Sequence, residues 1–243
     1  MNVNQLIKKI LFLVLVIASF SFAFKKEGPA VLVFSKTNGY RHQSIPTGID
    51  AIKKMGIENN FTVDATEDSL AFTKENLAKY KVVIFLSTTG HVLGEEQQKA
   101  FENFIQKGGG FVGVHAATDC EYDWAWYVKL VGASFLSHPA QQMAKIIVTD
   151  KNNIATKHLP EIWERKDEWY NFKSMNPDVH VLLKIDETSY TGGKNGDNHP
   201  MAWYHEYDGG RAFYTELGHT TESYSEPAYL QHLLGGIKYA LKQ

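Results

Sequence analysis

Short apolar runs and amphipathic stretches alternate along the chain from residue 29 to residue 115. The runs are rich in β-branched residues and show no helical stripe, which favours strands that are buried on both faces. These predicted strands cover residues 29–35, 61–66, 81–87 and 111–115. The amphipathic stretches predict helices at 44–56, 73–80 and 94–110. Strands that alternate with helices indicate a parallel sheet covered by helices on both faces.

The second half of the chain is richer in strands, which are predicted at 143–150, 179–186, 200–207 and 210–217. The last two are joined at Asp208-Gly209, a tight-turn signal that predicts a hairpin. A helix over 226–243 closes the chain, and no repeat, low-complexity tract or linker interrupts it. The fold class is therefore α/β, with one domain over 24–243. We expect a mostly parallel central sheet with extra strands from the second half.

The first 23 residues have the layout of a secretory signal peptide. Lys8 and Lys9 precede an apolar run over 10–17, and small residues around Ala23 suit cleavage there. The alternative is an uncleaved membrane anchor, but the apolar run is short for a bilayer span of about 20 residues. We therefore expect an exported protein, periplasmic or secreted, that is not an integral membrane protein after cleavage.

Charge and cysteine content narrow the function classes. Loss of Lys8 and Lys9 with the signal peptide changes the formal net charge from −2 to −4. A mildly acidic chain without a long basic run argues against a nucleic-acid partner. Cys120 is the single cysteine, so no internal disulfide can form. It is either a reactive thiol or a partly buried bystander, and the second is favoured.

Several histidines follow predicted strand ends. Ligands of parallel sheets bind beyond the carboxyl ends of the strands, so the loops after Phe34, Leu86 and Val114 should gather on one rim. Imidazole titrates near neutral pH and can move a proton or bind a metal. Each of these histidines alone is typical of a structural or surface residue, but together they predict a site. They are His42, His91, His115, His138 and His219.

Carboxylates accompany these histidines. Asp119 follows His115 by four residues, and Glu222 follows His219 by three. A carboxylate beside an imidazole fixes its tautomer, which suits proton transfer. Because these spacings place acid groups near the rim, Asp119 and Glu222 are candidate catalytic residues.

A second acidic stretch, Asp167-Glu168, precedes Trp169 and Tyr170. A carboxyl group against an apolar ring can have a raised pKa and act as an acid. The alternative for the acidic pair is a solvated helix end or turn. Tryptophans are mostly core residues, but one at the rim would suit stacking against a sugar face. The stretch therefore adds Glu168 as a candidate acid and Trp169 as one of the tryptophans that could stack on a sugar.

Several common motifs are missing. The chain has no GxGxxG, P-loop, HExxH, Cys-rich metal motif or G-x-S-x-G elbow. The triple glycine at 108–110 closes a helix and enters a strand, which is the reverse of a phosphate-binding order, and it reads as a plain turn. The sequence itself therefore requires no cofactor.

Five stretches in order resemble the trehalose-utilization, or ThuA-like, family. They are NGYRHQSI, GVHAATD, SHP, DEWYNF and GRAFYTELGHTTE, and the resemblance covers about residues 29–241. That family has a flavodoxin-like sandwich similar to the class I glutamine amidotransferases. The resemblance therefore implies the same α/β fold that the pattern of strands and helices predicts.

The comparison with the amidotransferases bears on the strand end at His115. Their corner holds G-x-C-x-G with a cysteine nucleophile, and a later His and Glu complete the triad. Here Gly113, Ala117, His219 and Glu222 resemble that frame, while His115 occupies the nucleophile position. Imidazole cannot take the acyl-carrying role of a thiolate, so glutaminase activity should be absent.

The family is implicated in disaccharide catabolism, alongside enzymes that oxidise sugars to 3-keto derivatives, and exported members are often labelled glycosyl hydrolases. The resemblance thus implies an enzyme that acts on a disaccharide, glycoside or keto-sugar, as a hydrolase or a lyase-type enzyme. In this hypothesis His115 and His219 are the acid/base pair, and Glu222 orients His219. Asp119 and Glu168 assist this acid/base pair. The substrate contacts are His42, His91, His138, Tyr170 and Trp169.

Three alternatives stay open. Two or three of the imidazoles could hold Zn²⁺, with a water in the open position. The chain could instead be a non-catalytic saccharide-binding protein that reuses the cleft. It could also be a scaffold subunit whose histidines serve an interface, and the aromatic-rich second half would suit the surface of a homo-oligomer.

Overall fold

The computed structural model describes residue 2 and residues 28–243. The predicted signal peptide, residues 1–23, lies outside the described residues except for Asn2, so it stays a prediction. Over 28–243, none of the helices combines the length and the apolar character that a membrane crossing requires.

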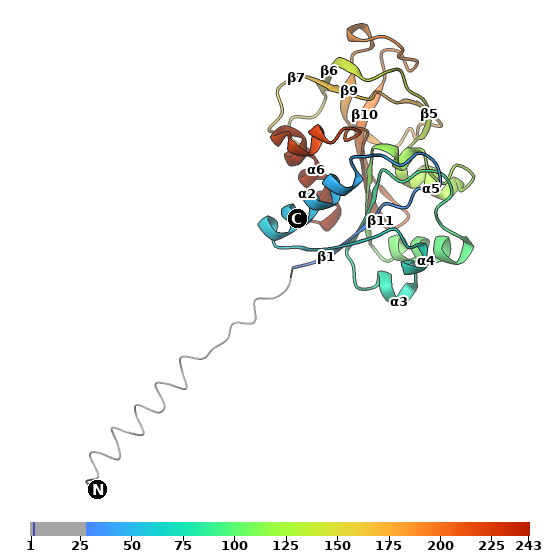
Figure 1. Cartoon of the computed structure of the whole chain (residues 1–243), viewed down its shortest axis with the longest axis vertical. Coiled ribbons are helices and arrows are strands. Elements are labelled where there is room, and N and C mark those ends of the chain that lie inside the picture. The colour runs from blue at the N-terminus through green and yellow to red at the C-terminus, as the bar shows by residue number, and fades with distance from the viewer. Residues whose placement is uncertain (1, 3–27) are drawn as a thin grey trace.

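A nine-stranded mixed sheet runs through the molecule in the order β2-β1-β3-β4-β11-β10-β9-β6-β7 (Figure 1). The five strands from β2 to β11 in this order pair in parallel, and the others pair antiparallel. Their bounds are β1 Ala30–Phe34, β2 Thr62–Thr66, β3 Val82–Leu86, β4 Gly110–Val114, β6 Gln142–Val148, β7 Ile162–Asp167, β9 His180–Ile185, β10 Pro200–Tyr207 and β11 Gly210–Thr215. The predicted α/β domain with a parallel core and extra strands is confirmed.

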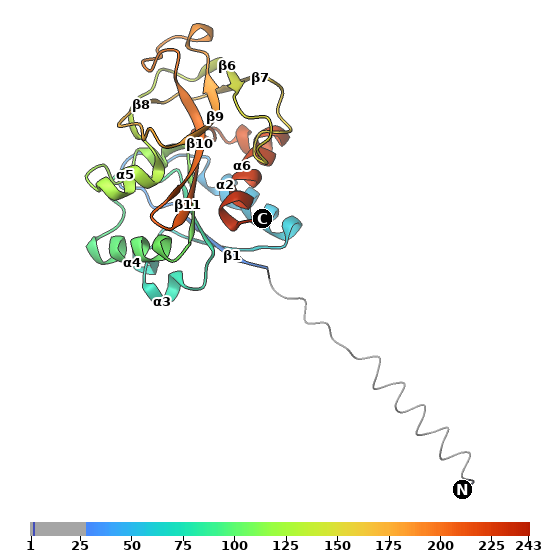
Figure 2. The ribbon, with the colours of Figure 1, turned by 180° about the vertical axis from the view of Figure 1, so that it is seen from behind.

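Helices cover both faces of the parallel part of the sheet. The helices α2 (Ile45–Asn59) and α6 (Pro227–Leu241) lie together on one face (Figure 1). The other face carries α3 (Lys74–Leu77), α4 (Glu95–Gln106) and α5 (Ala125–Val131), as the reverse view shows (Figure 2). Because both faces are covered, every residue of β3 and β4 is buried. This explains why these strands read as unbroken apolar runs in the sequence.

The predicted hairpin between the last two strands is confirmed. In the antiparallel pair of β10 and β11, Tyr207 faces Gly210. The two turn residues, Asp208 and Gly209, have φ angles of 48° and 88°. Positive φ at both central positions is the type I′ geometry, which matches the twist of the two strands. The hairpin brings β11 beside β4, so the segment after Thr215 reaches the end of β4.

Four short elements escape the sequence prediction: α5, β7, β5 (Ser134–Ser137) and β8 (Asn171–Lys173). In β7, burial alternates along the strand, but the inward residues are Trp163, Arg165 and Asp167. Two of these are charged, so the strand lacks the apolar alternation that marks a half-buried strand. Asp167 ends a strand in the interior, and the alternative of a solvated helix end or turn is wrong for it.

The loops that follow β1, β3 and β4 gather on one rim, as predicted. Thr37 forms a bridge with Thr89, and Gly90 forms one with Cys120. The Cys120 side chain is buried, and burial raises the pKa of its thiol well above the usual value. A thiol that stays protonated is a poor nucleophile, so Cys120 is a buried bystander.

Candidate functional site

His115 stands at a strained corner at the end of β4. Its φ angle is +50°, a left-handed conformation that residues with a Cβ adopt at a cost, and its side chain is fully buried. The Tyr214 hydroxyl donates a hydrogen bond to the His115 carbonyl over 2.7 Å, which holds the corner against β11. Strained strand-to-helix corners of this kind present nucleophiles in other α/β enzymes. Here the corner presents an imidazole.

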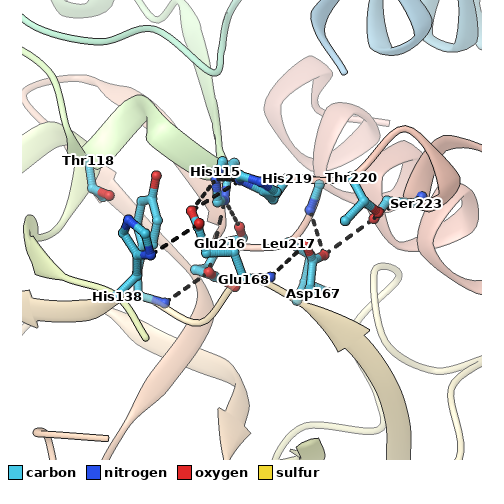
Figure 3. Close-up of polar contacts among 12 residues, drawn as sticks. His115, Thr118, His138, Asp167, Glu168, Glu216, Leu217, His219, Thr220 and Ser223 are labelled. Carbon is cyan, nitrogen blue, oxygen red and sulfur yellow. Dashed lines mark hydrogen bonds and ion pairs between the residues drawn. The ribbon is translucent and has the colours of Figure 1, made fainter. Parts of the chain in front are cut away.

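Two histidines and a carboxylate meet at this corner (Figure 3). His115 Nε2 lies 3.0 Å from His219 Nδ1. Glu168 Oε2 lies 3.4 Å from His115 Nε2 and 3.1 Å from His219 Nδ1. The three atoms therefore form a compact triangle, although they come from the ends of β4, β7 and β11.

His42 completes the group from the loop after β1. Its buried ring stands edge-on to the rings of His115 and His219, with centroids 4.8 Å and 5.0 Å away. One donor atom from each of the four side chains lies within 4.8 Å of the others. We call His42, His115, Glu168 and His219 the inner cluster. Three imidazoles and one carboxylate at this spacing could hold a divalent metal ion.

Hydrogen bonding defines the tautomer of His115. Its Nδ1 lies 2.7 Å from the Glu216 carbonyl oxygen, which can only accept a hydrogen bond. The proton of a neutral His115 ring therefore sits on Nδ1, and the lone pair on Nε2 points into the inner cluster.

Burial and mutual charge set the protonation of the inner cluster. Burial, with the neighbouring imidazoles of His115 and His219, lowers the pKa of His42 to about 2, so this ring is neutral. Burial alone raises the pKa of Glu168, but hydrogen bonds and charge from His115 and His219 outweigh it and hold that pKa well below its usual range. The inner cluster thus combines a carboxylate with at least one neutral imidazole.

His138 lies on the solvent-facing side of Glu168, and Asp119 interacts electrostatically with both. His138 Nδ1 lies 3.1 Å from Glu168 Oε1, and 45% of the His138 side chain is exposed (Figure 3). Burial raises the pKa of Asp119 to about 6, with His138 opposing the shift and Glu168 adding to it. A carboxyl group with this pKa can hold or release a proton near neutral pH.

Sequence comparison identifies the family. The model of the family described as "Trehalose utilisation", ThuA, matches residues 30–240. The chain belongs to the ThuA family. A comparison with functionally curated proteins gives no match.

Solved structures share the ThuA fold of this chain. A ThuA-like protein from Bacteroides uniformis is 24% identical with a TM-score of 0.74, and covers 88% of this chain and 92% of its own. A ThuA-like protein from Parabacteroides merdae is 21% identical with a TM-score of 0.73, and the match covers 88% of this chain and 90% of that protein. A β-galactosidase from Bacillus circulans sp. alkalophilus is 14% identical with a TM-score of 0.55, and covers 88% of this chain but 30% of its own. At these identities the likeness concerns the fold.

Three predicted residues of this ThuA chain stand apart from the inner cluster. His91 is exposed over 60% of its side chain and pairs with Asp123 at 3.5 Å, outside the inner cluster. Trp169 is fully buried and donates a hydrogen bond to the Gln142 carbonyl over 2.9 Å, so it cannot stack on a sugar. Glu222 is exposed, and its predicted role of orienting His219 is wrong, since Glu168 occupies that position.

Tyr170 reaches the site as a packing residue. Its ring centroid lies 4.5 Å from that of His115 and 4.4 Å from that of Phe135, and its side chain is almost fully buried. The backbone N–H of Tyr170 donates to Glu216 Oε1 over 3.0 Å, while Glu216 Oε2 is buried without a hydrogen-bond partner among the described residues. Burial raises the pKa of Glu216 well above its usual value, and Glu216 Oε1 lies 3.9 Å from His115 Nδ1.

A buried ion pair between Arg165 and Asp167 holds the loop that carries His219. Asp167 Oδ2 lies 2.9 Å from Arg165 Nη1 and accepts a hydrogen bond from the Gly218 N–H over 3.1 Å. Ser223 also donates to Asp167 Oδ2 over 3.3 Å (Figure 3). The only signal for this contact in the sequence is that Asp167 precedes Glu168. Asp167 therefore fixes the positions of both Glu168 and His219 from one side.

Proposed function

We propose that this ThuA chain is an exported enzyme of saccharide catabolism that acts on a disaccharide, glycoside or keto-sugar by proton transfer. The observation that carries the proposal is the position of Glu168, whose Oε2 faces the buried histidines and whose Oε1 faces the exposed His138. A carboxylate in this position couples a solvent-facing imidazole to a buried polar cluster. Export rests on the signal-peptide pattern of residues 1–23.

The residues on the solvent side divide into an acid and a base. His138 can accept a proton from a sugar hydroxyl or from a carbon next to a keto group, because Glu168 stabilises the imidazolium that forms. Asp119, with its pKa of about 6, can return a proton to a leaving oxygen. Removing a proton and supplying another are the two steps that glycoside cleavage next to a carbonyl requires. The proposed roles of His138 and Asp119 therefore suit hydrolase or lyase chemistry.

The family description supports a saccharide as the substrate class, because the matched family is described as "Trehalose utilisation". Glutaminase activity is not expected. The corner that would hold a cysteine nucleophile holds His115, and the single cysteine is buried with a pKa well above its usual value. An acyl group therefore has no thiolate to accept it.

An NMR time course tests this proposal. The mature chain is incubated with trehalose, sucrose, a β-linked disaccharide and the 3-keto derivative of each, beside Glu168→Gln and the control His91→Ala. We expect new sugar signals with the parent and the His91 variant, and none with Glu168→Gln. Broadened sugar resonances without new signals would replace the enzyme with a saccharide-binding protein. Spectra without new signals and without broadening would contradict both the enzyme and the saccharide-binding protein.

A further inference from the structure

The inner cluster brings together more donor atoms than a pair of proton-transfer residues needs. Four side chains from four separate segments each place one donor atom within 4.8 Å of the other three. We infer that the inner cluster is a binding site for one divalent transition-metal ion. This inference goes beyond the proton transfer proposed above and does not depend on the identity of the substrate.

The spacing of the donor atoms fits a metal ion. Zinc binds imidazole nitrogen and carboxylate oxygen at about 2.1 Å, so neighbouring donors of a tetrahedral site lie about 3.4 Å apart. The three sides of the triangle between His115 Nε2, His219 Nδ1 and Glu168 Oε2 measure 3.0, 3.1 and 3.4 Å. The atoms therefore need to move by only a few tenths of an ångström to surround an ion.

The hydrogen bonding of His115 also suits a ligand. Its Nδ1 lies 2.7 Å from the Glu216 carbonyl oxygen, so in the neutral ring Nδ1 carries the proton and Nε2 presents its lone pair to the inner cluster. Histidine ligands of metals almost always donate their other N–H to a carbonyl or a carboxylate, which fixes the ring and the tautomer. The buried Glu216 and Tyr170 beneath His115 keep water away from this hydrogen bond.

His42 supplies a further observation. Its side chain is buried, and its Nδ1 has no hydrogen-bond partner among residues 28–243. A buried polar atom without a partner requires an explanation. His42 stands edge-on to both His115 and His219, so the ring lies in contact with the proposed ligands. An ion bound through Nδ1 would give this atom the partner that it lacks among the described residues.

The donor set selects the class of ion. Imidazole nitrogen suits Zn²⁺, Fe²⁺, Co²⁺, Ni²⁺ and Cu²⁺, whereas Mg²⁺ and Ca²⁺ prefer sites built from oxygen. The inner cluster offers three imidazoles and one carboxylate. Glu168 Oε1 is engaged by His138, so Glu168 would bind the ion through Oε2 alone. The ion would then lie one carboxylate away from the solvent-facing His138.

Metal binding tests the inference without any sugar present. The mature chain is freed of metal with a chelator, its folding is checked by circular dichroism, and it is titrated with Zn²⁺ by calorimetry. We expect one Zn²⁺ per chain, with no competition from excess Mg²⁺ or Ca²⁺. Co²⁺ should bind in the same ratio and give the visible absorption of a nitrogen- and oxygen-ligated ion.

Two ligand variants and one control locate the site. His219→Ala and Glu168→Gln should each weaken Zn²⁺ affinity by at least about 100-fold, since loss of even a supporting residue costs about 10- to 100-fold. His91→Ala, an exposed histidine outside the inner cluster, should keep the affinity of the parent. Parent affinity in both ligand variants would overturn the inference. So would a folded, metal-free parent that binds neither Zn²⁺ nor Co²⁺ at about 100 μM, and that result needs no variant to fold.

Discussion

Glu168 Oε1 lies 3.1 Å from Nδ1 of His138, which joins a largely buried carboxylate to a half-exposed imidazole. The same carboxyl group contacts two buried histidines through Oε2. Glu168 therefore connects the buried part of the site with its solvent-facing part.

Replacing Glu168 with glutamine should lower kcat/KM on the active saccharide by about 10²- to 10⁴-fold, the range that acid–base catalysis contributes. The amide keeps the shape of the side chain but can no longer stabilise a charged His138. Steady-state kinetics on the substrate found by NMR would measure the loss.

Glu222→Gln is the matched control for this variant. Glu222 is an exposed glutamate three residues beyond His219, with no hydrogen bond or ion pair to that ring among the described residues. Its variant should retain the activity of the parent. Equal losses in both variants would contradict the assignment of Glu168 as the residue that orients His219.

The pH dependence of activity should follow Asp119. Its pKa is raised to about 6, so the proton that it donates is present below pH 6 and is lost as the pH rises through that value. We expect kcat/KM to fall on the alkaline side of about pH 6. Asp119→Asn should lower activity and abolish this alkaline fall in kcat/KM. Asp123→Asn, on an exposed side chain, should leave the fall in place. The same alkaline fall in kcat/KM in Asp119→Asn would mean that another group titrates.

Much of the fold follows from the sequence because the parallel strands are covered on both faces. Strands β3 and β4 are buried along their whole length, so their apolar runs are unambiguous. The strand β7 escapes prediction because the charged Arg165 and Asp167 point inward and neutralise each other. In the sequence, charged residues at these positions are typical of an exposed segment, and only the structure shows that they pair in the interior.

The candidate site was predictable in its histidines and less so in its carboxylates. His42, His115 and His219 each follow a strand whose end must lie on the rim, so topology alone brings them together. The spacing along the sequence favoured Glu222 as the partner of His219. Glu168 takes that position because β7, which pairs antiparallel with β6 at the far edge of the sheet, runs in the same direction as β4 and β11. Its carboxyl end therefore lies on the same rim, which no local pattern reveals.

The ion pair between Arg165 and Asp167 should be essential for stability. Both side chains are buried, and Asp167→Asn removes the carboxylate at Arg165 Nη1 while Glu226 still pairs with Nη2 at 3.0 Å. Loss of one partner of a buried ion pair costs up to about 3–5 kcal/mol. Asp167→Asn should therefore lower the melting temperature by about 10 °C, as calorimetry would show. Glu164→Gln, on an exposed position of the same strand, should change it little. A melting temperature near that of the parent in Asp167→Asn would show that the pair contributes little.

Acid should destabilise the chain through His232. This fully buried ring lies 2.8 Å from the Ala155 carbonyl and 3.1 Å from Thr215 Oγ1, and burial lowers its pKa from 6.5 to about 3. Between these values the unfolded chain binds a proton that the folded chain does not. Each pH unit below about 6.5 therefore removes up to about 1.4 kcal/mol from the free energy of unfolding.

Urea unfolding at pH 6.5 and pH 4.5 measures this loss of stability in the parent and in His232→Gln. The variant lacks the titrating ring. The free energy of unfolding of the parent, relative to that of the variant, should therefore fall by about 2 kcal/mol from pH 6.5 to pH 4.5. His180→Gln, at an exposed position of β9, should show no such convergence. A difference that stays constant with pH would mean that His232 is protonated in the folded chain at the same pH as in the unfolded chain.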